Sequence, residues 1–142
     1  MAQGSNKIML EIVTPYGAVY AGEVDEVVAQ GTEGEFGVMP GHAHMVTTIK
    51  PGLLTAGTLG AKPAYFFVGS GYAEVGPDKV VVMADSAEKS EDIDVERAMN
   101  ARKKAEEELR RQETEGFVSA ESALERAIAR VHVAEHTGTG MK

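Results

Sequence analysis

The chain has 142 residues, 43% hydrophobic and 25% charged, a composition typical of a folded soluble protein, and no apolar run approaches the roughly 20 residues of a membrane-spanning helix. Its formal charge of −8 argues against nucleic acid as the main partner, because positive charge drives binding to phosphates. The absence of cysteine excludes disulfides and thiolate chemistry and fits a reducing cytoplasm.

The segment from Lys7 to Asp85 has the pattern of short β-strands separated by turns. Its apolar residues alternate with polar ones or form short β-branched runs, and turn sequences such as "TPYG" and "GAKP" lie between them. Short strands at this spacing predict an antiparallel β-sandwich or flattened barrel. The predicted strands cover residues 7–14, 18–30, 44–50, 53–59, 64–70, 71–76 and 79–85.

A glycine-rich segment, "GTEGEFGVMPGH", occupies residues 31–42 and is predicted to be a loop. It is not a phosphate-binding loop, because no Lys followed by Ser or Thr comes after its last glycine. Glu33 and Glu35 would also repel an anion. The acidic residues together with apolar ones that include Phe36 and Met39 favour a surface that contacts another protein.

After Ala87 the hydrophobic period becomes that of a helix. The segment 92–112 is predicted to be a helix with Asp92 as its N-cap, and 119–136 a second helix with Ser119 as its N-cap. The linker 113–118 is short enough to make the helices antiparallel. The predicted fold class is therefore α+β, with a β-sandwich over residues 1–88 and a two-helix hairpin over 89–142.

Alanine dominates the apolar stripes of both predicted helices. Burial of apolar area stabilises by about 25 cal/mol per Å², so an alanine-lined seam is worth far less than a leucine-lined one. We therefore expect a marginally stable hairpin that can detach when a partner offers a better surface. The stripes consist of Ala98, Ala101, Ala105 and Leu109 on the first helix, and Ala120, Ala123/Leu124, Ala127/Ile128 and Val131 on the second.

The sequence contains no recognisable catalytic motif: GxSxG, HExxH and cysteine are all absent. Two histidine pairs have a spacing that would suit metal ligands. His42 and His44 could share one strand face, and His132 and His136 are spaced one helical turn apart. No third ligand lies near His42 and His44, and His132 and His136 are interpreted as part of a solvated helix end, so no metal is expected.

Three arginines of the predicted hairpin permit two interpretations. Arg97 lies near the start of the first helix, whereas Arg126 and Arg130 lie one turn apart on the second, so antiparallel pairing could bring all three together. Converging guanidinium groups would suit a polyphosphate ligand. Alternatively, they form surface ion pairs with neighbours such as Glu96 or Glu125.

Three separated segments carry a resemblance that covers nearly the whole chain. They are "GTEGEFGVMPGHAHMVTTIKPG", "KVVVMADSAE" and "DIDVERAMNARKKAEEEL". In this order and spacing they resemble the epsilon subunit of bacterial F-type ATP synthase. His44 is a departure, since the family usually has proline there.

The resemblance implies a non-catalytic rotor subunit of a proton-translocating enzyme, peripheral at the cytoplasmic face of the bacterial inner membrane. Its β-sandwich would bind the gamma subunit and the ring of c subunits, with Glu35 and His42 at positions that lie against the ring. The helical hairpin would be regulatory: permissive when folded on the sandwich, and inhibitory to ATP hydrolysis when extended along gamma toward the alpha and beta subunits.

Some members of the family also bind ATP in the folded hairpin, and the resemblance extends to their motif. Lys104 departs from it, because ATP-binding members carry arginine there. ATP, with magnesium, is therefore a possible regulatory ligand, and no other cofactor is expected. The matching positions are Glu88, Ile93, Asp94, Arg97, Ala98, Arg126 and Arg130.

The competing hypothesis is a free-standing β-sandwich adaptor or ligand-binding module with a helical appendage. It predicts a pocket in the sandwich lined by aromatic residues. The chain has no Trp and only four each of Phe and Tyr, so few aromatic residues could line such a pocket.

Overall fold

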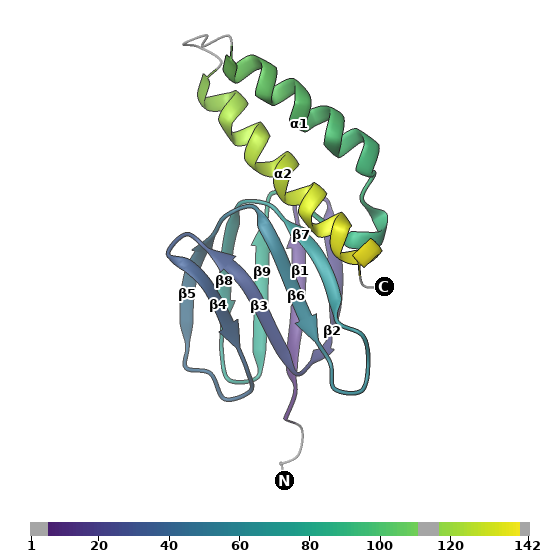
Figure 1. The fold of residues 1–142 in the computed structure, drawn as a ribbon. Helices are drawn as coiled ribbons and strands as arrows, with labels where there is room; N and C mark the ends of the chain where they lie inside the picture. The colour runs from purple at the N-terminus through teal and green to yellow at the C-terminus, as the bar shows by residue number, and fades with distance from the viewer. Residues whose placement is uncertain (1–5, 111–116, 140–142) are drawn as a thin grey trace.

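A computed structural model describes residues 6–110 and 117–139 of the chain (Figure 1). These residues form a β-sandwich followed by an antiparallel pair of helices, which confirms the predicted fold class. The strands are β1 (Ile8–Thr14), β2 (Gly17–Val24), β3 (Glu26–Gly31), β4 (Gly34–Val38), β5 (Met45–Ile49), β6 (Gly52–Gly57), β7 (Ala64–Val68), β8 (Gly71–Val75), β9 (Lys79–Ala84) and β10 (Ala87–Lys89). A 3₁₀ helix, η1 (Ser90–Asp92), leads into α1 (Val95–Arg110) and α2 (Phe117–Thr139).

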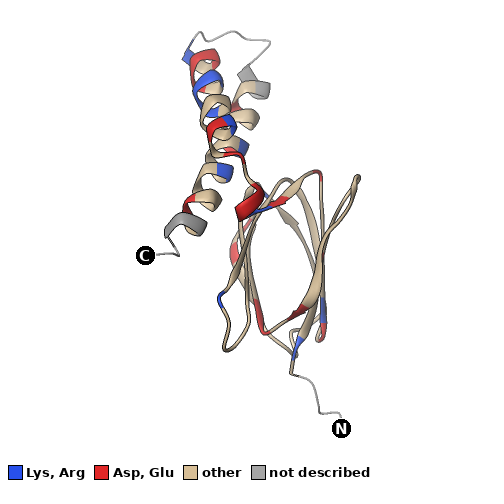
Figure 2. Cartoon of the chain, turned by 90° about the vertical axis from the view of Figure 1, so that its right-hand side faces the viewer, with Lys and Arg blue, Asp and Glu red and all other residues tan. Residues whose placement is uncertain are grey.

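The strands join into a flattened, nearly closed barrel. Their order is β10-β7-β6-β3-β5-β8-β9-β1-β2, and β4 pairs with the other side of β3. Figure 2 shows the two layers edge-on, with the hairpin at one end. All pairs are antiparallel except β1 and β9, which run parallel. A parallel pair needs a long connection, and these two strands are separated by most of the sandwich sequence.

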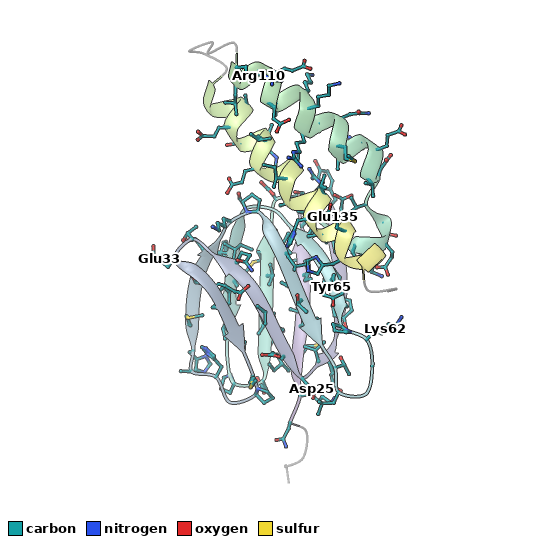
Figure 3. All side chains as sticks on the ribbon, viewed as in Figure 1. Asp25, Glu33, Lys62, Tyr65, Arg110 and Glu135 are labelled. Carbon is teal, nitrogen blue, oxygen red and sulfur yellow. The ribbon has the colours of Figure 1, made fainter. Side chains whose placement is uncertain are left out.

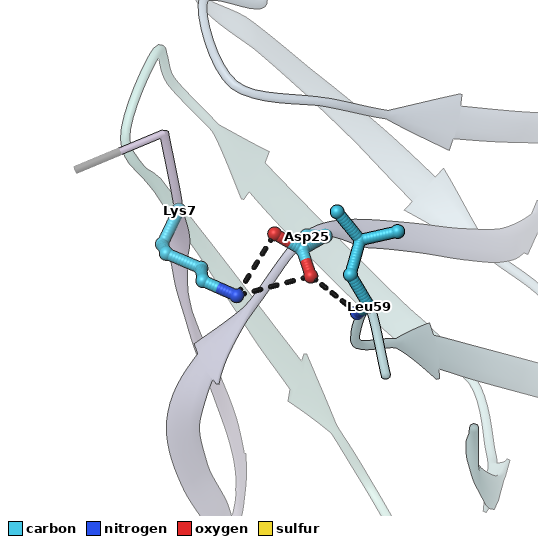
Figure 4. Close-up of polar contacts among 3 residues, drawn as sticks. All are labelled: Lys7, Asp25 and Leu59. Carbon is cyan, nitrogen blue, oxygen red and sulfur yellow. Dashed lines mark hydrogen bonds and ion pairs between the residues drawn. The ribbon is translucent and has the colours of Figure 1, made fainter. Parts of the chain in front are cut away.

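The strand predicted over residues 18–30 is divided at Asp25. β2 pairs with β1, whereas β3 pairs with β4 and β6 in the other layer, so the chain changes layers at this residue. The Asp25 carboxylate accepts hydrogen bonds from the Leu59 amide at 2.6 Å and from Lys7 Nζ at 3.0 Å (Figure 4). Through these bonds Asp25 ties the start of β1 to the β6–β7 loop.

The glycine-rich segment is not a single loop, so that prediction is wrong for residues 34–38. These residues form β4, which pairs with β3 in a hairpin turning at Thr32 and Glu33. Gly34 has a φ of 126°, which L-residues rarely adopt. From Met39 to His44, beyond the end of β4, the chain forms neither strand nor helix.

Alternation along the strands fills the interior of the sandwich. Ile8, Leu10 and Ile12 of β1 are fully buried, and Phe66 of β7 packs its ring 5.1 Å from that of Tyr20. Phe67 belongs to a second cluster, which joins the sandwich to the hairpin and also contains Ile93, Ala98, Ala129, Val131, Val133 and Ala134. Residues of the hairpin therefore pack against the outer face of β7, and this contact docks the hairpin on the sandwich.

The helix starts differ from the predicted caps. Asp94 caps α1 by accepting a hydrogen bond at Oδ1 from the Arg97 amide at 3.0 Å, whereas Asp92 ends η1. The helix α2 begins at Phe117, two residues before the predicted cap Ser119. Most of the predicted linker 113–118 lies outside the described residues.

The predicted alanine seam is largely present. Ala98, Ala105, Ala120 and Ala127 are buried, and α1 and α2 lie side by side and antiparallel (Figure 1). Ala101 was expected in the seam but is exposed. The helix α2 also packs on β6 and β7, so its buried residues contact either α1 or the sandwich.

Candidate functional site

A cavity of about 450 Å³ lies where the sandwich meets the start of the hairpin. It opens between β10, η1, the first turns of α1 and the middle of α2. Its volume falls in the range of pockets that hold small molecules. The lining residues are Glu88, Asp92, Ile93, Asp94, Arg97, Ala98, Ala101 and Arg130.

Each wall of the cavity is fixed by local structure. β10 pairs with β7 and places Glu88 opposite Phe67 at the sheet edge. Ile93 has an extended backbone and is 7% exposed, which fixes the chain between η1 and α1. Asp94 then caps α1, and this places Arg97 in the first turn of the helix.

Arg130 is the side chain that connects the cavity to the sandwich. Its Nε donates to Glu88 Oε1 at 2.7 Å, and its guanidinium carbon lies 4.3 Å from the centre of the Phe67 ring. The side chains of Arg130 and Glu88 are each about one-third exposed, at 29% and 34%. The contact is thus a charge-assisted hydrogen bond combined with a cation–π interaction.

The charges around the cavity are mixed. Glu88, Asp92 and Asp94 contribute three carboxylates, against the two guanidinium groups of Arg97 and Arg130. One of these carboxylates already pairs with Arg130. An anionic ligand would therefore fit best together with a cation, which would offset the remaining acidic charge.

The structure brings six of the seven predicted ATP-site residues to one cavity: Glu88, Ile93, Asp94, Arg97, Ala98 and Arg130. Arg126 is half-buried one turn earlier on α2 and is not among the lining residues. Arg130 does form an ion pair, but with Glu88 rather than with the expected helical neighbours. Nucleotide binding at these residues stays a prediction.

Glu35 and His42 do not lie together. Glu35 is in β4 and accepts a hydrogen bond from Gln30 Nε2 at 2.8 Å, near the end of the sandwich that carries the hairpin. His42 follows the end of β4 and has its Nδ1 2.7 Å from the Ala43 carbonyl oxygen. The five residues of β4 span about 17 Å at the usual strand rise, and Figure 1 shows β4 running away from the hairpin.

The histidine pairs do not form a recognisable metal centre. Within residues 6–110 and 117–139, no group of three or more His, Cys, Asp or Glu side chains is arranged to hold a metal ion. His136 lies one turn after His132, with its Nδ1 3.0 Å from the His132 carbonyl oxygen and its ring 5.2 Å from that of Tyr65. Figure 3 shows Tyr65 on the strand that faces α2.

Sequence reasoning missed Phe67 as part of the site. The signal was the adjacent pair Phe66–Phe67, because neighbouring residues of a strand point to opposite faces. If Phe66 fills the sandwich interior, Phe67 must face outward and needs a cover. The cover is α2, with Arg130 above the Phe67 ring.

The fold and this cavity define a two-part protein, in which a helical hairpin docks on a β-sandwich around a charged junction. None of the helices in the described part of the chain is long and apolar enough to cross a membrane.

Comparison with known proteins assigns both parts to one family. Residues 7–90 match the family model described as "ATP synthase, Delta/Epsilon chain, beta-sandwich domain", and residues 91–135 match the corresponding "long alpha-helix domain". The chain belongs to the ATP synthase delta/epsilon chain family.

Several relatives are similar over almost their whole length. The ATP synthase epsilon chain of Geotalea daltonii is 45% identical over 94% of this chain and 98% of that protein. The epsilon chain of Dehalococcoides mccartyi strain BAV1 is 44% identical over 91% and 93%.

A solved structure of the Euglena gracilis mitochondrial ATP synthase, comprising OSCP, F1 and c-ring, contains a chain with the same fold. The TM-score is 0.76 at 23% identity, covering 97% of this chain and 83% of that one.

Proposed function

We propose that the chain is a non-catalytic central-stalk subunit of a proton-translocating F-type ATP synthase. The match of both the sandwich and the hairpin to the delta/epsilon family is the observation that carries this proposal. In this role the sandwich joins the catalytic head to the c ring, and the protein is peripheral at the cytoplasmic face of the bacterial inner membrane.

The sandwich binds the gamma subunit and the c ring in this proposal. The sheet face formed by β5, β8, β9 and β1 supports a protein contact, because it exposes Val46 at 68% and Tyr72 at 45%. Glu35 and His42 are the proposed c-ring contacts, and His42 follows β4 at the end of the sandwich away from the hairpin. Met39 beside it is 60% exposed and would add apolar contact area.

The hairpin is the regulatory element. Docked on the sandwich it permits rotation, and extended toward the alpha and beta subunits it blocks ATP hydrolysis. The small alanine side chains of the α1–α2 seam support this role, because little apolar area opposes separation of the helices. Figure 2 shows that charged residues are more frequent along the hairpin than along the strands of the sandwich.

The cavity is the proposed regulatory site for ATP with magnesium. Arg97 and Arg130 would bind phosphate oxygens, and the acidic lining residues would hold the metal ion or the base. A ligand that binds only the docked hairpin stabilises it by RT ln(1 + [L]/Kd), which is about 2.7 kcal/mol at a hundredfold excess over Kd. High ATP would then relieve inhibition.

Two experiments test these proposals separately. Affinity purification of the tagged chain from membranes should recover gamma and c subunits; recovery without any ATP synthase subunit contradicts the stalk assignment. Calorimetric titration of the purified chain with MgATP should give saturable heat that Arg97→Ala abolishes. Arg102→Ala is the matched control, because Arg102 is on the same helix and pairs with Glu106 outside the cavity. Absence of saturable heat at millimolar MgATP contradicts nucleotide sensing.

A further inference from the structure

The interface between hairpin and sandwich contains a cross-strand socket for one arginine. β7 and β10 pair so that Phe67 lies directly opposite Glu88. Directly opposed residues of an antiparallel pair have their side chains on the same face of the sheet. Phe67 is fully buried in the docked state, although it faces out of the sandwich. The sheet alone therefore presents an aromatic ring and a carboxylate side by side.

Arg130 occupies this socket through two contacts, a cation–π contact with Phe67 and a hydrogen bond to Glu88. Its guanidinium carbon lies over the ring, 4.3 Å from the ring centre, while its Nε donates to Glu88 Oε1 at 2.7 Å. A planar, always-charged fork can satisfy both partners at once, which a lysine ammonium cannot do equally well. Among the ion pairs of the described residues, this one joins the hairpin to the sandwich.

The apolar cluster that contains Phe67 consists largely of alanine and valine residues. Ala98 and Ala129 contribute little apolar area, and Ile93 and Val133 are buried members of the same cluster. The Arg130–Glu88 pair is partly open to water, with side chains 29% and 34% exposed, whereas the Phe67 ring under the guanidinium group is fully buried. An interface of this composition depends on its central contact far more than a leucine-rich interface would.

We propose that Arg130, seated between Phe67 and Glu88, is the latch that keeps the hairpin docked on the sandwich. Loss of the latch releases the hairpin while both parts remain folded. Arg130 acts here as a positioning residue, because it holds one part of the chain against the other without a ligand.

The test measures docking directly in the purified full-length chain without nucleotide, so its result does not depend on whether the cavity binds ATP. The natural sequence has no cysteine, so spin labels at Lys62→Cys and Arg110→Cys report one distance between the sandwich and the hairpin tip. Figure 3 labels both positions, far apart and exposed. We expect a single dominant distance in the parent chain by double electron–electron resonance.

Arg130→Met keeps the apolar stem of the side chain but removes both latch contacts. Because an ion pair this exposed is worth at most about 1 kcal/mol and the cation–π contact adds about 0.5–1 kcal/mol, the ratio of undocked to docked hairpin should rise roughly threefold to thirtyfold. Glu88→Gln should produce a smaller rise. Arg102→Met is the matched control and should leave the distance unchanged, because its partner Glu106 is one turn away on α1.

Combining Arg130→Met with Glu88→Gln distinguishes a latch, in which the two residues act through one contact, from two residues that contribute to docking independently. In a latch the second substitution adds little once the first has been made. Additive effects would overturn the proposal, as would an Arg130→Met chain that keeps the parent distance distribution. Far-ultraviolet circular dichroism checks that helices and sheet persist. If Arg130→Met does not fold, Arg130→Lys and Glu88→Gln apply the same test, and an unchanged distance in both overturns the latch.

Discussion

Asp94 should be required as a helix cap, whatever its role toward a ligand. Its carboxylate accepts the Arg97 amide at 3.0 Å, and its carbonyl accepts the first intrahelical bond, from the Ala98 amide at 3.0 Å. Replacing a capping Asp by Ala costs about 1 kcal/mol, and loss of its charge at the helix N-terminus adds about 0.3–1 kcal/mol. Asp94→Asn keeps the cap and loses only the charge.

Amide hydrogen exchange of α1 measures this difference. Asp94→Ala should lower protection in the first turns of the helix by roughly five- to thirtyfold, the factor that corresponds to one or two kcal/mol. Asp94→Asn should lower it by a few-fold at most. Equal protection in the two variants would refute the capping argument and would leave ligand binding as the reason for an aspartate at this position.

The remaining predictions concern the sandwich. Hydrogen bonds from the Leu59 amide, and then from the Lys7 ammonium, lower the pKa of Asp25, so its ionised form stabilises the fold above the ordinary aspartate pKa and this contribution is lost as pH falls. Asp25→Asn should therefore unfold at lower urea than the parent at pH 7, with the difference shrinking in acid; a pH-independent difference would contradict the assignment. Gly34→Val should destabilise the fold by about 1–3 kcal/mol, because Gly34 has a φ of 126°. Gly37→Val should be tolerated, since a Cβ added at Gly37 meets only ordinary van der Waals contacts. Similar urea midpoints for the two variants would show that the backbone angle at Gly34 is unimportant.

The order of strands and helices could be predicted from hydrophobic period alone, because that period reflects which face of each element is buried. The division of the predicted strand 18–30 could not. The alternation changes phase at Asp25 and Glu26, since the buried Val24 and Val27 lie three residues apart, but a β-bulge would give the same pattern. The change of layer depends on hydrogen bonds to Leu59 and Lys7, which are distant in sequence. β4 was missed for a related reason, since its glycines signal a loop while the partner β3 supplies its hydrogen bonds.

At the candidate site, the start of α1 and the contacts of Arg130 could not be predicted from the sequence either. Both Asp92 and Asp94 have the chemistry of a cap, but burial of Ile93 in an extended conformation prevents a helix from starting before it. The convergence of Arg97 and Arg130 was predictable from antiparallel helices. The pairing of Arg130 with Glu88 and Phe67 was not, because it depends on how the hairpin sits on β7 and β10.

In the proposed function the sandwich couples the enzyme while the hairpin regulates it. The most direct measurement compares ATP hydrolysis and proton-driven ATP synthesis by membranes whose ATP synthase carries either the full chain or a chain ending at Asp92, which keeps β10 and η1 with the sheet. With the shortened chain we expect normal assembly and synthesis, together with faster hydrolysis. Hydrolysis that stays unchanged, or an enzyme that no longer assembles, would contradict it.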